Sequence, residues 1–273
     1  YQKGIYMTFF MLYATANEGD YSLDFLHFKQ LIKFSSGVDV IRLVLVVSLV
    51  TEKTLKDEEF ELAVRKFFSS TSSIKLDSVI FKSNVGRDFS SVALGLAHIK
   101  DTYGFHDSFI LVRNRSAYGP FSNFWFSEFK DQLMKADIGM VGATLNFLEH
   151  PDIGKRVRPH VQTYVYMIKP CLLDKLFDDF PATNCEERLQ LIDEGEIGLS
   201  EIILSEGFKL LSLQFPKQKV GGNTLISDCR LVRDPRDYSS KLVFKHRNVV
   251  KYYPSFLVFF LSKVKKKILK TLR

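Results

Sequence analysis

Apolar runs of strand length alternate with amphipathic helical stretches along most of this chain. The run over residues 5–13 is followed by a helical pattern over residues 23–34 and by a second apolar run over residues 43–50. Continuously apolar strands are typical of parallel sheets whose two faces are covered by helices. The pattern therefore predicts an α/β fold with an open, mostly parallel sheet and helices on both faces, in which ligands bind beyond the carboxyl ends of the strands. Further strands are predicted at 78–81, 109–112, 138–143, 161–168 and 209–215, and further helices at 58–68, 89–103, 124–135, 170–177, 186–192 and 196–206.

The composition is that of one soluble globular domain with a basic end. Of the 273 residues, 46% are hydrophobic and 25% are charged, which excludes collagen-like, disordered and disulfide-stapled classes. The three cysteines are too few for a disulfide framework and indicate a reducing compartment. Six of the seven net positive charges fall in residues 255–273, so the remainder is almost neutral and offers no broad face for nucleic acid. We therefore divide the chain into a domain over residues 1–250 and a tail over residues 251–273.

The first polar segment at a predicted strand end is Lys-Ser-Asn-Val-Gly-Arg-Asp, residues 82–88, which runs directly into a predicted helix. Asp88 is placed to cap that helix, and Gly86 lets the backbone approach a ligand. Free backbone amides together with Arg87 suit an anion. A well-capped helix with a surface arginine explains the same residues equally well.

The second segment begins at residue 111 and reads Leu-Val-Arg-Asn-Arg-Ser-Ala-Tyr-Gly-Pro. Arg113 and Arg115 alternate with Asn114 and Ser116 at the carboxyl end of an apolar strand, and Gly119 begins a sharp Gly-Pro turn. Guanidinium groups beside short hydrogen-bonding side chains suit a diphosphate. An ordinary Asn/Ser turn is the alternative.

The third segment begins at residue 159 and reads Pro-His-Val-Gln-Thr-Tyr. The two-residue alternation of a strand would place His160, Gln162 and Tyr164 on one side, either facing a ligand or forming the solvent face of an edge strand. No metal-ligand cluster accompanies His160, and the sequence contains no nucleophile elbow, Walker loop or GxGxxG segment. Covalent catalysis, ATP hydrolysis and nicotinamide binding are therefore disfavoured.

In their order, these segments resemble the rhamnan-synthesis-F-like and galactofuranosyltransferase-like glycosyltransferases of surface-polysaccharide assembly. That family carries N-x-G-R-D, N-x-S-x-x-G-P, V-G-x-S-x-N and H-x-Q-S segments, followed by a glutamate-led helix. The resemblance covers residues 5–250. The matching residues here are Asn84, Gly86, Arg87 and Asp88; Asn114, Ser116, Gly119 and Pro120; residues 141–146; His160, Gln162 and Thr163; residues 196–200; and Phe244 with Lys245 in a closing signature.

The resemblance implies a GT-A type, Rossmann-like nucleotide-sugar fold and an inverting glycosyltransferase. The implied partners are a nucleotide-sugar donor, with a UDP- or dTDP-sugar expected, and a hydroxyl of a lipid-linked glycan acceptor. The implied donor-binding residues are Asn84, Gly86, Arg87, Asp88, Asn114, Arg115, Ser116, Gly119 and Lys245, and the implied acceptor- or sugar-binding residues are His160, Gln162 and Tyr164.

Inverting transfer needs a carboxylate that takes the proton of the acceptor hydroxyl. The resemblance favours Glu196, which opens its predicted helix, with Glu201 as the second candidate and Glu194 and Asp88 as rivals. Many GT-A enzymes hold Mg²⁺ or Mn²⁺ with a D-x-D segment, which this sequence lacks. A guanidinium is an alternative charge partner for the diphosphate, so no ion is assigned. The missing segment also leaves open a non-catalytic carbohydrate- or nucleotide-binding module of a polysaccharide-assembly complex.

The tail has the pattern of an interfacial helix. Its apolar run is far shorter than the ~20 residues that cross a bilayer. We therefore expect it to lie on an anionic membrane surface, which places the chain on the cytoplasmic face of the cell membrane as a peripheral protein. A helix packed on the same domain or on a second copy is the alternative. The apolar face comprises Leu257, Leu261, Val264, Ile268 and Leu272, and the basic face comprises Lys263, Lys266, Lys270 and Arg273.

Deletion of residues 255–273 is expected to abolish binding to anionic vesicles and to leave a folded, nearly neutral domain. Binding of the full chain should fall steeply with salt, because charges are screened over about 8–10 Å at physiological ionic strength, and the apolar face should retain a residual part. Vesicle sedimentation of both chains measures this. Intact binding after truncation, or unfolding of the truncated chain, would favour the packed helix instead.

Overall fold

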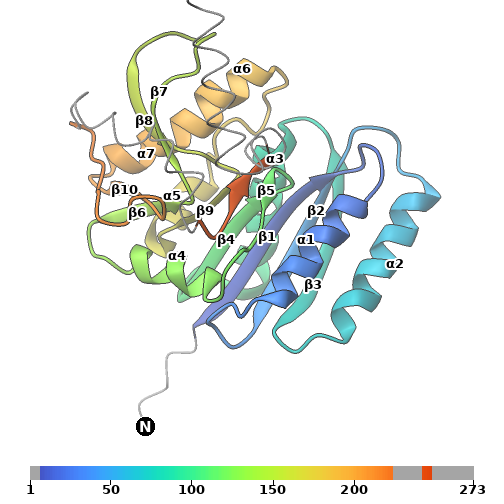
Figure 1. Cartoon of the computed structure of the whole chain (residues 1–273). Coiled ribbons are helices and arrows are strands. Elements are labelled where there is room, and N and C mark those ends of the chain that lie inside the picture. The colour runs from blue at the N-terminus through green and yellow to red at the C-terminus, as the bar shows by residue number, and fades with distance from the viewer. Residues whose placement is uncertain (1–6, 224–241, 248–273) are drawn as a thin grey trace, which may run out of the picture.

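The computed structural model describes residues 7–223 and 242–247, and its centre is a seven-stranded sheet (Figure 1). The strands are β1 (Thr8–Ala16), β2 (Ile41–Leu49), β3 (Ile74–Ser83), β4 (Ser108–Asn114), β6 (Ile138–Gly142), β9 (Val165–Ile168) and β10 (Lys209–Ser212). Their order is β10-β6-β9-β4-β1-β2-β3, and every pairing is parallel except those of β9 with β4 and β6. The predicted mostly parallel α/β sheet is confirmed.

The central strands are apolar on both faces because helices cover both faces. In β1, Met11 and Tyr13 pack into one hydrophobic cluster, whereas Phe10 and Leu12 pack into the other, and all four are fully buried. This alternation explains why the strand reads as an unbroken apolar run rather than as an apolar-polar repeat. Helices α1 (Ser22–Lys33), α2 (Leu55–Ser69) and α4 (Trp125–Leu133) contribute to the first cluster, and α3 (Arg87–Tyr103), α5 (Pro170–Phe177) and α7 (Gly198–Ser205) contribute to the second.

The segment between β6 and β9 differs from the predicted single strand over residues 161–168. It forms a hairpin of β7 (Leu145–Leu148) and β8 (Val157–Val161), followed by a turn over residues 162–164. Because β9 runs opposite to β4 and β6, it begins at the edge of the sheet where those strands end. The hairpin and the turn therefore lie over the carboxyl edge.

The two helices predicted at 186–192 and 196–206 are one continuous helical stretch. A short α6 (Arg188–Gln190) leads into a π-helical segment, η1 (Leu191–Ile197), which continues as α7. The prediction that Glu196 opens a helix was therefore wrong, because Glu196 lies near the end of the π-helical segment. The acidic residues at positions 193–196 do not mark the start of a helix, because the backbone is helical both before and after them.

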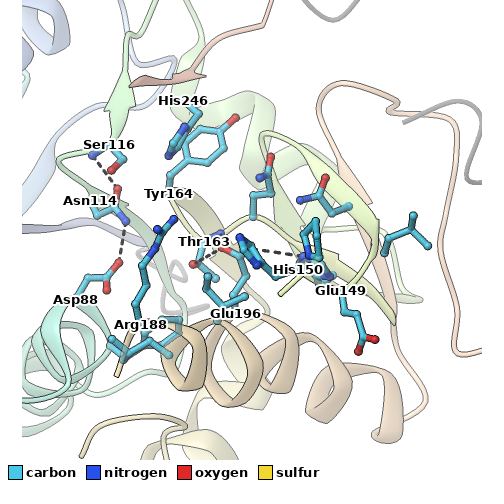
Figure 2. Close-up of a pocket in the computed structure, with 18 of the residues that line it drawn as sticks. Asp88, Asn114, Ser116, Glu149, His150, Thr163, Tyr164, Arg188, Glu196 and His246 are labelled. Carbon is cyan, nitrogen blue, oxygen red and sulfur yellow. Dashed lines mark hydrogen bonds and ion pairs between the residues drawn. The ribbon is translucent and has the colours of Figure 1, made fainter. Parts of the chain in front are cut away.

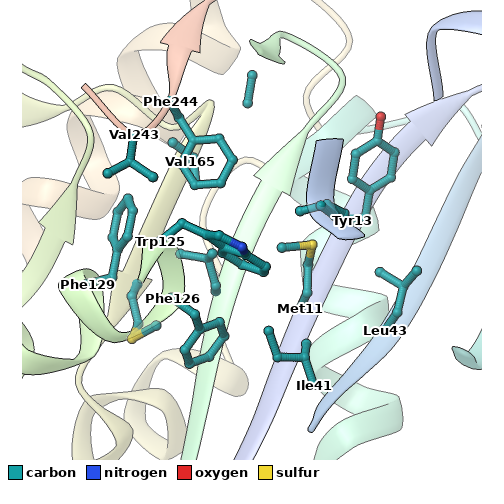
Figure 3. Packing of buried hydrophobic residues seen from close by; sticks show 14 of the residues in the cluster. Met11, Tyr13, Ile41, Leu43, Trp125, Phe126, Phe129, Val165, Val243 and Phe244 are labelled. Carbon is teal, nitrogen blue, oxygen red and sulfur yellow. The ribbon is translucent and has the colours of Figure 1, made fainter. Parts of the chain in front are cut away.

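The segment 242–247 lies against β4 and α4. Its strand β11 (Lys245–His246) pairs antiparallel with β5 (Ala117–Tyr118). Phe244 is fully buried among the rings of Trp125 and Phe129 (Figure 3). Its ring lies 5.2 Å from the Arg113 guanidinium carbon. This aromatic residue anchors the segment to the core.

The predicted basic tail lies outside the described residues. Within residues 7–223 and 242–247, no helix combines the length and the apolar character that crossing a bilayer requires.

Replacing Phe244 by Ala is expected to lower the free energy of unfolding by about 3–5 kcal/mol, because it opens a cavity between helix and sheet and removes the ring beside Arg113. Phe121→Ala is the matched control, since that ring is 43% exposed and its loss should cost less than about 1 kcal/mol. Urea denaturation measures both. Equal losses would contradict the anchoring role.

Candidate functional site

A cavity of about 810 Å³ opens at the carboxyl edge of the sheet (Figure 2). Its walls come from the end of β4, the start of α3, the β7–β8 hairpin, the turn after β8, the helical stretch from α6 to η1, and β11. Segments far apart in the sequence thus meet at the edge where ligands of parallel sheets bind. Eight of the predicted site residues line it, namely Arg87, Asp88, Asn114, Ser116, His160, Gln162, Tyr164 and Glu196.

The Glu196 carboxylate is held by side-chain and backbone donors. Its Oε1 lies 3.4 Å from His160 Nε2, and its Oε2 accepts hydrogen bonds from the Thr163 backbone amide and hydroxyl, each at 3.1 Å. Burial by itself raises the pKa of a carboxyl group, but His160 and Thr163 outweigh it here, so the pKa of Glu196 lies below its usual value. Glu196 is therefore an ionised carboxylate in a fixed orientation.

The orientation of His160 is set by the backbone of β8. Its Nδ1 lies 2.7 Å from the Arg158 carbonyl oxygen, which only accepts hydrogen bonds, so Nδ1 carries the donated proton. Nε2 then acts as a donor to Glu196 only when the imidazole is protonated. The pair is an ion pair in that state.

Asn114 links the second carboxylate of the cavity to the loop after β4. Its Nδ2 donates to Asp88 Oδ2 at 2.8 Å, and its Oδ1 accepts from the Ser116 amide at 2.9 Å. Burial raises the pKa of Asp88, and the nearby charge of Glu196 adds to the rise. The prediction that Asp88 caps α3 was wrong. Gly86 is the N-cap residue, and Asp88 lies within the first turn.

His160, Gln162 and Tyr164 all reach the cavity, although they do not share one strand. His160 belongs to β8, and the other two belong to the turn that follows. The Thr144 hydroxyl lies 2.7 Å from Gln162 Oε1 and 3.1 Å from the Tyr164 hydroxyl, which ties the turn to the start of the hairpin. The strand alternation used to group the three residues was wrong, but the grouping itself agrees with the cavity.

Arg115 and Glu201 lie outside the cavity lining and are engaged elsewhere. Arg115 forms an ion pair with buried Asp24 at 3.0 Å and donates to backbone carbonyls of the loop after β1. Glu201 forms a bidentate pair with Arg158 at 2.7 and 2.8 Å. Both side chains therefore hold the scaffold together, and neither faces the ligand space.

The turn before α3 does not offer the free amides that its sequence suggested. The Gly86 amide donates to the Cys185 carbonyl, and the Arg87 amide donates to the Asn84 carbonyl, each at 3.0 Å. Gly86 adopts a left-handed conformation with φ 68°, and a Cβ there would lie 2.0 Å from the Thr183 carbonyl oxygen. Asn84 and Gly86 thus shape the turn, and of this segment only Arg87, Asp88 and the following Phe89 line the cavity.

The closing segment contributes His246 rather than the predicted Lys245. His246 lines the cavity with its ring 5.3 Å from that of Tyr164, whereas Lys245 Nζ lies over the Phe121 ring. Neighbouring residues of a strand point to opposite sides. The residue that reaches the cavity is therefore His246, one position after the phenylalanine-lysine signature. Gly119 lies beneath this segment, since a Cβ there would meet the Val243 carbonyl oxygen at 2.5 Å.

Three basic and three acidic side chains line the cavity, but the basic ones lack a partner among the described residues. Arg87, Lys155 and Arg188 line it, and no hydrogen bond or ion pair of their side chains occurs within the described part of the chain. The carboxylate of Glu149 is already paired with Arg156 at 3.0 Å. An anionic ligand is therefore favoured. Sequence reasoning missed Lys155, Arg188 and His246, because none stands in a motif.

The described residues contain no metal centre made of protein ligands alone. No three His, Cys, Asp or Glu side chains in residues 7–223 and 242–247 are grouped so that they could hold an ion. At the position expected for D-x-D, the Asn114 amide group is taken up by Asp88 and the Ser116 amide.

No family model matches the sequence, and no curated protein matches it. The solved structures similar to this chain include three glycosyltransferases. The mannosyltransferase PcManGT from Pyrobaculum calidifontis, in complex with GDP-Man and Mn²⁺, has a TM-score of 0.49 and 12% identity over 76% of this chain and 55% of its own. Mouse xyloside xylosyltransferase 1 has a TM-score of 0.40 and 12% identity over 63% of this chain and 71% of its own. The glycosyltransferase GlyE of Streptococcus pneumoniae TIGR4 has a TM-score of 0.38 and 13% identity over 77% of this chain and 46% of its own. This chain thus spans about half the length of the first and third.

Replacing Gly86 by Ala is expected to lower the free energy of unfolding by about 3 kcal/mol, because a left-handed alanine is strained and its Cβ collides with the Thr183 carbonyl. Gly19→Ala is the matched control. Its φ is 80° but nothing lies within 4 Å of the added Cβ, so only the strain of about 1 kcal/mol applies. Thermal or urea unfolding separates the two. Equal losses of unfolding free energy in the two variants would show that the Thr183 carbonyl does not restrict the residue at position 86.

Proposed function

We propose that this chain is a glycosyltransferase that moves a sugar from a nucleoside-diphosphate donor to a hydroxyl of an acceptor glycan. One observation carries the proposal: an ionised, fixed carboxylate and unpaired cations face the same cavity. Transfer of this kind needs a base for the incoming hydroxyl and positive charge for the departing diphosphate. The order of the segments that resemble the glycosyltransferase family supports the same reading.

Glu196 is the proposed base. A carboxylate has about four lone-pair positions. Thr163 occupies two of them and His160 lies beside a third, which leaves room for the acceptor hydroxyl. As that hydroxyl oxygen forms its bond to the anomeric carbon, its proton passes to Glu196. The bond from the anomeric carbon to the diphosphate oxygen breaks, and the diphosphate leaves with the electron pair. Attack from the side opposite to the diphosphate inverts the anomeric carbon.

The finer assignment rests on the resemblance and on the tail. The family resemblance supports a UDP- or dTDP-sugar donor, a hexosyl group and an acceptor in cell-surface polysaccharide synthesis. The basic amphipathic tail supports a peripheral position on the cytoplasmic face of the membrane, where a lipid-linked glycan is presented. Arg87 and Asp88 are the proposed donor-side residues, and His160, Gln162 and Tyr164 the acceptor-side residues.

Replacing Glu196 by Gln is expected to lower kcat by about 10²–10⁴-fold, because the amide keeps the shape of the side chain but cannot take the proton. The affinity for the donor should not change. The wild-type rate should fall as the pH drops through the lowered pKa of Glu196, since only the ionised form is a base. Steady-state kinetics and donor titration measure both.

The matched control is Glu206→Gln, a carboxylate beyond the end of α7 that pairs with Lys175 outside the cavity. Its kcat should equal that of the wild type. An unimpaired Glu196→Gln enzyme would remove Glu196 as the base.

A further inference from the structure

Arg188 extends from α6 into the cavity. Figure 2 shows its side chain between the Asp88–Asn114 pair on one side and Thr163 with Glu196 on the other. Arg188 thus lines the same cavity as the carboxylates of Asp88 and Glu196.

The Arg188 guanidinium has no hydrogen bond or ion pair among residues 7–223 and 242–247. The carboxylates that follow it on the same helical stretch are already engaged. Asp193 pairs with Arg158, Glu194 accepts from Gln190 at 2.8 Å, and Glu196 is held by its own donors. An incoming anion therefore meets a cation without first breaking an ion pair.

The π-helical segment brings Arg188 and Glu196 onto one face. They are eight residues apart, and Leu191 and Ile192 between them also line the cavity. In an α-helix of 3.6 residues per turn, side chains eight positions apart point in directions that differ by about 80° around the helix axis. The i→i+5 hydrogen bonding of a π-helix widens the turn and reduces that difference. The cation and the base are thus fixed relative to each other on one element.

We infer that Arg188 binds the diphosphate of the donor and stabilises the charge that develops on it as the bond to the sugar breaks. The inference rests on the proposed function. A planar guanidinium suits phosphate oxygens because it donates two parallel hydrogen bonds. Arg115, which the sequence suggested for this role, is held by Asp24 and the loop after β1. Arg188 is therefore an available charge partner for the diphosphate on the same helical stretch as the proposed base.

The test is calorimetric titration of the full chain with UDP, GDP and dTDP, compared with the corresponding nucleosides measured by ligand-observed NMR. Arg188→Gln should weaken binding of the preferred nucleoside diphosphate by about 10- to 100-fold, the loss expected for a charge-assisted hydrogen-bond pair. Binding of the nucleoside should not change, because it carries no phosphate. Arg188→Lys should restore part of the affinity. Arg65→Gln is the charge-matched control, since Arg65 pairs with Glu61 on α2 away from the cavity, and it should bind as the wild type.

The outcomes separate the two proposals. Wild-type affinity for the diphosphate in Arg188→Gln would overturn the role of Arg188 and leave the glycosyltransferase proposal standing. Failure of the wild type to bind any of the three diphosphates would overturn both. If Arg188→Gln melts below the wild type, its nucleoside affinity decides whether the cavity is intact. Unchanged nucleoside binding with a weakened diphosphate supports the inference, and unchanged binding of both overturns it.

Discussion

The reversed direction of one strand determines where this molecule can hold a ligand. Because β9 lies antiparallel between β4 and β6, the chain leaving β6 must enter β9 at the same edge of the sheet. The whole connection, with its hairpin and turn, is thereby kept over the carboxyl ends of the central strands. A purely parallel crossover would have carried it back along a face of the sheet. The cavity wall is a consequence of this single reversal.

The wall is fastened to the helical stretch by polar contacts. Arg158 of β8 pairs with Glu201 and with Asp193, and its carbonyl orients His160 against Glu196. The Val161 amide donates to the Ser200 hydroxyl at 3.0 Å. Groups that look like ordinary surface charges in the sequence thus hold the hairpin on the helix. The same contacts give the Glu196 carboxylate its donors, and a buried carboxylate without them would be neutral.

Most of the sheet could be predicted from the sequence, because long apolar runs such as those of β1 and β2 are direct consequences of burial on both faces. The hairpin could not, since β7 and β8 are only four and five residues long and neither shows an apolar-polar alternation long enough to predict a strand. The π-helical segment was hidden for a similar reason: Gly195 and the acidic residues around it resemble a helix boundary. In the structure, Gly195 instead lets the helix approach the Phe89 ring, which a Cβ would meet at 2.6 Å.

For the site, the motifs located the right edge of the sheet but not every side chain. Asp88, Asn114, His160 and Glu196 stand in recognisable segments and meet in the cavity. Arg115 looked equivalent to its neighbours, yet its direction depends on Asp24, which comes from a helix far away in the sequence. Arg188 has no local signature at all. Its position follows from the path of the helix, which is a property of the tertiary structure.

A cavity that turns over a nucleotide sugar must release a nucleoside diphosphate, and a donor screen measures that release. The full chain would be incubated with UDP-, dTDP- and GDP-sugars, with and without Mg²⁺ or Mn²⁺ and with a mixture of glycan acceptors, and release of the nucleoside diphosphate would be followed over time. We expect one class of donor to release its diphosphate while its sugar appears on an acceptor or on water. Binding of a donor without any release would contradict this expectation and would identify a non-catalytic binding module.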